Sequence, residues 1–271
     1  ITTGLRGICC LEVWLQGAKS DLHSGTFGGS VANPIQVLAE MLVDCKDPKT
    51  GKVLIPGFYD KVRKPTAAQR RAWAAVPHSD EKHRKSVGAP ALFGEKGFTT
   101  IERTGARPTF EVNGMWGGYI GEGVKTVLPS EAQAKISMRL VPDQDPDVIG
   151  KAAEKYLKSI APPHVRIKVK IEGNRGTPIW VSTDSREMRV CEEAVKTVFG
   201  KPPVHILEGG SIPIVADFKK TLKKDTILLG FGLPDDNLHA PNEKFDMAMF
   251  ERGMKTVAYF LDGLGKNEKL F

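Results

Sequence analysis

The sequence contains few cysteines and no closely spaced histidine pair that would form a local metal motif. Of its four cysteines, Cys9 and Cys10 are adjacent, and no Cys-x-x-Cys occurs. The six histidines form neither His-x-His nor His-x-x-x-His. These absences argue against a disulfide scaffold, a thiol redox motif and a zinc site built from one short segment.

Long apolar runs are also missing, since no stretch approaches the roughly 18 residues of a membrane-spanning helix. The first residues, Ile1-Thr2-Thr3-Gly4, include no initiator Met and no basic or apolar region typical of a signal peptide. We therefore expect reduced thiols and a cytoplasmic protein with no membrane partner. The missing Met suggests that the gene begins upstream of Ile1.

Basic charge is concentrated in one segment of the chain. Residues 61–107 hold 11 Lys and Arg against four Asp and Glu, which accounts for the entire net charge of +7. The segment contains no motif of a nucleic-acid-binding fold. We expect a solvated insertion there, and no nucleic-acid partner.

Apolar alternation in the first two thirds of the chain predicts strands at 9–15, 132–140 and 165–171, with a shorter strand near 110–112. Helical spacing predicts a helix capped by Ser30 and another over 146–160. Between them, residues 46–107 are mixed and rich in Pro and Gly, which indicates an insertion with short helices, one at 67–75. The order β-α-insertion-β-β-α-β is that of a split βαβ, ferredoxin-like unit.

After Trp180 the pattern changes to alternating helices and strands. Helices are predicted over 185–199 and 214–222, and strands near 204–207 and 226–231. A final helix presents an apolar face formed by Phe250, Met254, Val257 and Leu261. This alternation is typical of α/β folds, and it is short enough to be part of a larger sheet.

Several polar residues lie at the ends of predicted elements, where ligands of α/β proteins gather. His23 lies between a strand and a helix, and His239 follows an apolar strand. Glu208 opens a Gly-Gly-Ser turn, and Arg139 ends a half-buried strand, where a guanidinium can hold a carboxylate through two hydrogen bonds. Each also has a structural interpretation: a surface histidine, a helix cap by Ser211, or a solvated arginine. One histidine is not enough for a catalytic zinc, which needs about three protein ligands.

Five motifs follow one another along the chain. They are Asp21-Leu22-His23-Ser24-Gly25, Lys125-Thr126-Val127-Leu128-Pro129, Arg139-Leu140-Val141-Pro142, Glu208-Gly209-Gly210-Ser211-Ile212-Pro213 and Leu238-His239-Ala240-Pro241-Asn242-Glu243. In this order they resemble the motifs of M20 zinc metallopeptidases, in the branch of carnosinase and cytosolic non-specific dipeptidase. The resemblance implies a fold in two parts. An α+β lid of ferredoxin-like βαββαβ type covers residues 5–178, with an insertion at about 46–107. The C-terminal part of an α/β zinc-peptidase domain follows at 179–271.

The resemblance also implies a function: hydrolysis of dipeptides, as a carboxypeptidase-like hydrolase, by water activated on two zinc ions (manganese is an alternative). His239 would be a metal ligand. The lid would form a homodimer, and through it His23 would stabilise the oxyanion in the partner subunit's active site. Thr126 would make a second contact across the dimer.

Three further residues would bind the substrate. By resemblance Arg139 would hold its C-terminal carboxylate, and Glu208 and Ser211 would line the pocket near its amino end. The family's other metal ligands and its general base lie upstream of the matching region, so this chain alone is expected to be inactive and to bind no zinc pair. Two alternatives stay open: an N-acyl or N-succinyl amino acid deacylase of the same superfamily, and a non-catalytic dimerisation module.

Overall fold

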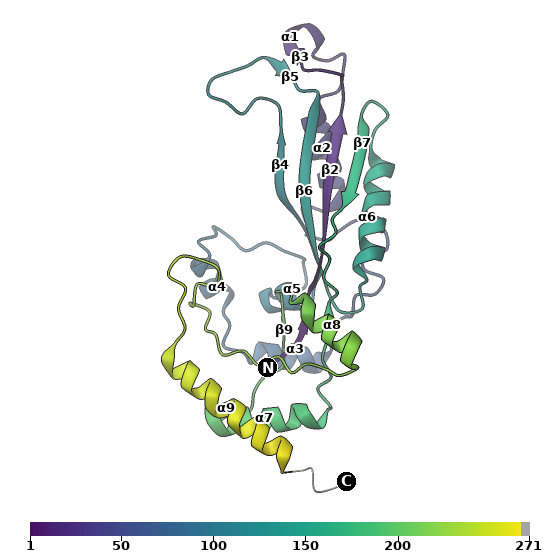
Figure 1. The fold of residues 1–271 in the computed structure, drawn as a ribbon. Helices are drawn as coiled ribbons and strands as arrows, with labels where there is room; N and C mark the ends of the chain where they lie inside the picture. Colours follow the sequence, from purple (N-terminus) through teal and green to yellow (C-terminus); the bar gives the residue numbers. More distant parts are fainter. Residues whose placement is uncertain (267–271) are drawn as a thin grey trace.

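Two separate sheets organise the fold, and they lie at different ends of an elongated molecule (Figure 1). The computed structural model describes residues 1–266. One sheet has four strands and the other has three, with a two-stranded ribbon beyond the four-stranded sheet. The fold is therefore mixed α/β with several sheets, as the sequence patterns indicate in outline.

The four-stranded sheet contains the strands that the alternating patterns predict. It consists of β2 (Gly7–Gln16), β4 (Thr109–Gly117), β6 (Glu131–Leu140) and β7 (Arg166–Ile171), in the order β4-β6-β2-β7. All neighbouring strands are antiparallel. The long pair β2–β6 runs in register from Gly7↔Leu140 to Gln16↔Glu131. Along both strands buried residues alternate with more accessible ones, because successive side chains point to opposite faces.

Helices α2 (Pro34–Cys45) and α6 (Pro146–Ile160) pack on this sheet and complete its core. The range of α6 confirms the prediction. The predicted cap of α2 is wrong: Asn33 caps it and accepts a hydrogen bond from the backbone N–H of Ile35 at 3.0 Å. Because Pro34 occupies the first helical position, the residue directly before it takes the cap, and the hydroxyl of Ser30 donates to the Phe27 carbonyl instead.

Beyond one end of the long strands, a short ribbon pairs β3 (Leu22–His23) with β5 (Val127–Leu128). The single-turn helix α1 (Ser24–Phe27) follows β3 directly. Figure 1 shows this ribbon and α1 at the far tip of the molecule. The ribbon is what brings the first two motifs of the sequence together.

The basic insertion contains three short helices: α3 (Ala67–Ala74), α4 (Asp80–Ser86) and α5 (Thr100–Gly105). The predicted helix at 67–75 is confirmed. The insertion is anchored to the C-terminal region, since the Nε1–H of Trp73 donates to the His205 carbonyl at 2.9 Å. Much of its positive charge is neutralised locally, for example by the buried ion pair of Arg107 with Glu95 at 2.7 Å.

The three-stranded sheet joins the start of the chain to its last third. Its strands are β1 (Thr2–Leu5), β8 (Ile179–Trp180) and β9 (Ile206–Glu208), with β1 in the centre, parallel to β9 and antiparallel to β8. Helices α7 (Arg186–Phe199), α8 (Pro213–Leu222) and α9 (Met247–Gly265) follow the sequence predictions closely.

One sequence prediction in this region is wrong. Residues 226–231 do not form a strand and make one isolated bridge, Leu228 to Thr2. Strand β8 already pairs with Gly4 and Leu5, so little of β1 is left for another strand. The apolar face of α9 is exposed, whereas its small residues Gly253 and Thr256 are buried, and α9 packs against α7.

Within residues 1–266, none of the helices combines the length and the apolar character that crossing a membrane requires.

Candidate functional site

The ribbon brings His23 and Thr126 together at the tip of the molecule. Thr126 precedes β5, and its Oγ1 lies 3.3 Å from Nε2 of His23. The backbone N–H of Ser24 also donates to the Thr126 carbonyl at 3.0 Å. Both side chains are exposed. The first and second motifs of the sequence therefore form one accessible pair.

The orientation and tautomer of the His23 ring are fixed by the turn that follows it. The backbone N–H of Gly25 donates to Nδ1 of His23 at 3.1 Å. In the neutral imidazole the proton then resides on Nε2, which makes Nε2 a hydrogen-bond donor. A Cβ atom on residue 25 would lie 2.9 Å from Cε1 of the ring, so glycine is needed for this approach.

Asp21 stabilises the same ribbon from its base. Its Oδ1 accepts hydrogen bonds from the backbone N–H of Ser130 at 2.8 Å and from the Ser130 hydroxyl at 2.9 Å. These two bonds favour the ionised form and hold the pKa of Asp21 below its usual value. Asp21 is thus a structural member of the first motif and not a free carboxylate for catalysis.

A second group of predicted residues meets at the opposite end of β6. Arg139 lies on β6, and its Nη1 donates to Oγ of Ser211 at 2.7 Å. The Ser211 hydroxyl donates in turn to the carbonyl of Arg6 at 2.6 Å. Glu208 ends β9 beside them, and its carbonyl accepts from the Arg6 N–H at 3.2 Å. The structure therefore brings together the third and fourth motifs, far from the first two.

His239 lies in the loop between α8 and α9, near the Glu208 end of this group. A groove of about 1300 Å³ is lined by Glu208, Leu233 and Leu238, the residue directly before His239. His239 is exposed, and its backbone N–H donates to Oε2 of Glu243 at 3.3 Å. Residues of the fourth and fifth motifs thus line the same groove.

The His239 loop has an unusual backbone. Asn237, His239 and Asn242 have φ values of 55°, 61° and 61°. Non-glycine residues in the left-handed region are uncommon, and such strain gathers at functional sites when the surrounding structure holds it. The buried carboxylate of Asp236 does so here, since it accepts from the Leu233 N–H at 2.6 Å.

The described residues do not fit a pair of zinc ions. Each zinc in a catalytic site takes about three protein ligands. Within 1–266, no group of three or more His, Cys, Asp or Glu side chains is placed to hold a metal. His239 therefore lacks a sufficient set of companion ligands in this part of the chain.

The length of β6 separates the two groups of predicted residues. Arg139 and Glu131, which lies next to the ribbon, are eight residues apart on one extended strand, about 26 Å at 3.3 Å per residue. A dipeptide spans only about 7 Å. One dipeptide therefore cannot contact Arg139 and His23 of the same chain in this conformation.

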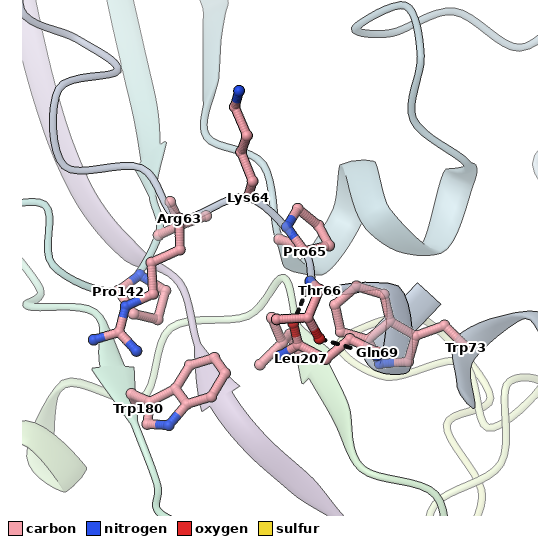
Figure 2. Close-up of a pocket in the computed structure, with 11 residues that line it drawn as sticks. Arg63, Lys64, Pro65, Thr66, Gln69, Trp73, Pro142, Trp180 and Leu207 are labelled. Carbon is pink, nitrogen blue, oxygen red and sulfur yellow. Dashed lines mark hydrogen bonds between the residues drawn. The ribbon is translucent and has the colours of Figure 1, made fainter. Parts of the chain in front are cut away.

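A different pocket, of about 560 Å³, lies between α3 and the three-stranded sheet. In Figure 2, Arg63 and Trp180 lie on one side of it, Trp73 and Leu207 lie on the other, and Lys64 points away. The Arg63 guanidinium stands over the Trp180 ring at 5.1 Å. None of the predicted site residues lines this pocket.

Sequence reasoning missed three features that the structure shows. Arg6 contacts the fourth motif, and Gly25 orients His23. The sequence signals for these two features were the Arg6-Gly7 pair at the start of β2 and the glycine two residues after His23. A His-x-Asp sequence at 78–80 was also overlooked. Its His78 and Asp80 lie 3.5 Å apart beside α4 in the insertion.

Comparison with known proteins gives one family and several relatives. Residues 3–165 match a family described as the peptidase dimerisation domain, M20_dimer. The chain is 30% identical to the Cys-Gly metallodipeptidase dug1 of Schizosaccharomyces pombe over 266 residues, which covers 97% of this chain and 56% of that protein. It is 29% identical to the Beta-Ala-His dipeptidase of Homo sapiens, covering 96% and 52%. The chain thus spans about half the length of the curated relatives that it matches.

Solved structures give the same picture. The di-peptidase Dug1p of Saccharomyces cerevisiae matches with a TM-score of 0.79 at 30% identity, over 98% of this chain and 56% of that one. An M20 family metallo-carboxypeptidase of Sulfolobus solfataricus matches with a TM-score of 0.83 at 30% identity, over 96% and 58%. Both similarities include the four-stranded and the three-stranded sheets, because they cover almost the whole chain.

Proposed function

Because this chain belongs to the M20 metallopeptidase family through its peptidase dimerisation domain, we propose that it acts in a dizinc dipeptidase whose active site combines residues of two copies of the chain. Of the similar proteins named above, three are called metallodipeptidases or dipeptidases and one a metallo-carboxypeptidase. Within this proposal, residues 5–178 are the lid and residues 179–271 belong to the catalytic domain. The separation into a four-stranded sheet and a three-stranded sheet, the latter containing β8 and β9, supports this division.

The lid is proposed as a ferredoxin-like unit that dimerises. Its chain order β2-α2-β4-β6-α6-β7 and its strand order β4-β6-β2-β7 support that topology. Strand β4 lies at an edge of the sheet and exposes Val112, Met115 and Trp116, whose exposed fractions are 43%, 38% and 41%. An open edge with apolar side chains favours contact with a second chain, and we propose a homodimer through this side of the lid.

The separation of about 26 Å along β6, between the His23–Thr126 pair and the Arg139–Ser211 group, is the observation that carries the proposal. A second protomer would bring the two groups of residues together, because its tip can reach the Arg139 group of the first protomer. In that arrangement Nε2–H of His23 from one chain donates to the developing oxyanion of a substrate held by the other chain. Thr126 keeps the ring in place through its 3.3 Å contact.

The residues at the other end of β6 would hold the substrate. Arg139 binds the C-terminal carboxylate, and Ser211 orients its guanidinium through the 2.7 Å hydrogen bond. Glu208, exposed at the end of β9, would meet the substrate's amino group. His239 would contribute one metal ligand.

Zinc, or manganese in its place, is the proposed cofactor, with two ions in each complete site. When bound, such a pair supplies an activated water for peptide hydrolysis. Since the described residues lack a fitting ligand set, we propose that this chain alone binds no zinc pair and shows no peptidase activity. A cytoplasmic location is likewise proposed, and the four free thiols support it.

Two measurements test the proposal. Zinc titration of the purified chain should show no tightly bound pair; two tightly bound equivalents per chain would contradict it. In the protein that contains this chain, a panel of dipeptides, N-acyl amino acids and N-succinyl amino acids should show preferential cleavage of dipeptides. Preference for acyl substrates would identify a deacylase, and inactivity on the whole panel would favour a dimerisation module.

A further inference from the structure

Arg6 connects the two sheets to the fourth motif. It lies between β1 and β2, where the chain passes from the three-stranded sheet to the four-stranded sheet. Its backbone N–H donates to the Glu208 carbonyl at 3.2 Å, and its Nε–H donates to the Gly209 carbonyl at 3.1 Å. Its own carbonyl accepts from the Ser211 hydroxyl at 2.6 Å. One residue thus makes hydrogen bonds to three of the four residues in the loop 208–211.

One of the two glycines of this loop, Gly209, is explained by its close contacts with Arg6 and Thr104. A Cβ atom on residue 209 would lie 2.6 Å from Nη2 of Arg6 and 2.6 Å from the Thr104 carbonyl oxygen, which real side chains do not tolerate. A Cβ atom on Gly210 would meet nothing within 4 Å. The close approach of the Arg6 guanidinium therefore requires glycine at 209 and leaves 210 unconstrained.

The contacts of Arg6 extend through Ser211 to Arg139. Because the Ser211 hydroxyl gives its proton to the Arg6 carbonyl, a lone pair of Oγ is left to accept from Nη1 of Arg139 at 2.7 Å. This arrangement uses one N–H of the Arg139 fork. Within residues 1–266 its other N–H groups make no hydrogen bond to the protein, which leaves them for a ligand.

In the described part of the chain, neither arginine at this point contacts a carboxylate directly, and the more distant charge of Glu111 offsets that of Arg6 only in part. Arg63, Arg70 and Arg107, which lie around the same junction, each pair with a carboxylate. In residues 1–266 neither Arg6 nor Arg139 forms such a pair, and their side chains donate to carbonyl and hydroxyl oxygens instead. Burial lowers the pKa of Arg6 to about 10, and the neighbouring charge of Arg139 adds to that effect. Two partly buried cations side by side favour an anion between or beside them.

We propose that Arg6 is a positioning residue for carboxylate recognition: it holds the loop 208–211 and the Ser211 hydroxyl so that Arg139 presents its free N–H groups to the substrate's C-terminal carboxylate. The proposal deepens the proposed function and rests on the role given there to Arg139. The main-chain carbonyl of Arg6 holds the Ser211 hydroxyl, and its guanidinium holds the Gly209 carbonyl and adds positive charge near Arg139.

Carboxylate binding can be measured on this chain without peptidase activity. The probes are N-acetylglycine, which carries a carboxylate, and N-acetylglycinamide, which is neutral but otherwise matched. NMR signals of the arginine Nε–H groups report on each guanidinium directly. We expect the Nε–H signal of Arg139 to shift with N-acetylglycine and to stay unchanged with the amide.

Variants then separate positioning from structural support. Arg6→Gln keeps the main-chain bonds to Glu208 and Ser211 but removes the guanidinium that holds the Gly209 carbonyl, and Ser211→Ala removes the hydroxyl that contacts Arg139. Each should weaken N-acetylglycine binding by about tenfold or more, the loss typical of one charge-assisted hydrogen bond. Arg6→Lys should recover part of the affinity, because it restores the charge. Arg63→Gln removes an arginine that is paired with Asp143, and it should leave the affinity unchanged.

The outcomes are distinct. If Arg6→Gln and Ser211→Ala lower the melting temperature but leave the affinity for N-acetylglycine unchanged, Arg6 is only structural and the proposal is overturned. If the unsubstituted chain binds N-acetylglycine no more tightly than N-acetylglycinamide, the proposal is also overturned, even if the protein that contains this chain cleaves dipeptides. Conversely, Arg6-dependent carboxylate binding by this chain, together with no cleavage of any dipeptide by the protein that contains it, supports this proposal and refutes the proposed function.

Discussion

The four-stranded sheet and the C-terminal helices differ in how completely the chain covers their apolar residues. In the sheet region, Leu11, Leu38 and Met138 are at most 1% exposed, because α2 and α6 close one face. On α9, Phe250 and Met254 are 49% and 54% exposed, although the apolar residues of this helix also recur on one face. Apolar periodicity thus reveals which face of an element is apolar, whereas burial depends on what packs against that face.

The largest expected effect is the loss of a core side chain in the four-stranded sheet. Leu11→Ala removes a side chain that is 1% exposed and packed within the main core. It should lower the free energy of unfolding by roughly 2–5 kcal/mol. Urea denaturation measures this loss, and a change as small as that of a surface substitution would contradict the assignment of this core.

The next effect concerns substrate binding at the junction of the two regions. In the active enzyme that contains this chain, Arg139→Met should lower kcat/KM for dipeptides by about ten- to a hundredfold or more, since it removes a charge-assisted hydrogen-bonding group. A dipeptide amidated at its C-terminus should be affected much less. Arg63→Met is the control. Equal losses on both substrates would indicate a structural role for Arg139.

A smaller effect is expected at the tip of the lid. Gly25→Ala places a Cβ atom 2.9 Å from Cε1 of His23, so the ring must shift. A displaced catalytic donor should lower kcat by roughly tenfold or more, without loss of folding. Gly173→Ala is the control, because a Cβ atom there meets nothing within 4 Å. Unchanged kcat in the Gly25 variant would show that the ring position does not matter.

The smallest effect should come from the exposed face of α9. Phe250→Ala is expected to change the stability of this chain by no more than about 0.5 kcal/mol, in contrast to Leu11→Ala. Thermal or urea unfolding of both variants gives the comparison. A large loss for Phe250→Ala would mean that its face is covered in solution, for example by a second copy of the chain.

Local sequence patterns predicted the long strands and helices correctly. They failed where a neighbouring element determines strand pairing or burial. The alternation in β6 and the helical spacing of α6 agree with the structure, since their buried faces are covered by neighbouring elements. Residues 226–231 have a strand-like composition, but β8 already pairs with most of that side of β1. The contacts of Arg6 could not be foreseen, because they join residues about 200 positions apart in the chain.

The same distinction applies to the candidate site. The motifs singled out His23, Thr126, Arg139 and Ser211, and the structure pairs them as His23 with Thr126 and Arg139 with Ser211. Their division into two groups follows from the length of β6, which sequence motifs do not report. That separation leads to the central claim that two chains build one site.

Subunit mixing tests this claim most directly, in the active enzyme that contains this chain. His23→Ala removes the donor, and His239→Ala removes the proposed metal ligand, so each variant alone should be nearly inactive, with losses of roughly 10²–10³ in kcat for the donor. In a mixed dimer, one site combines an intact metal ligand with an intact His23 from the other chain. We predict recovery of up to half the normal activity per mixed dimer. If mixed dimers form, as shown by two different affinity tags, and activity is not restored, His23 does not act across the interface and the account is contradicted.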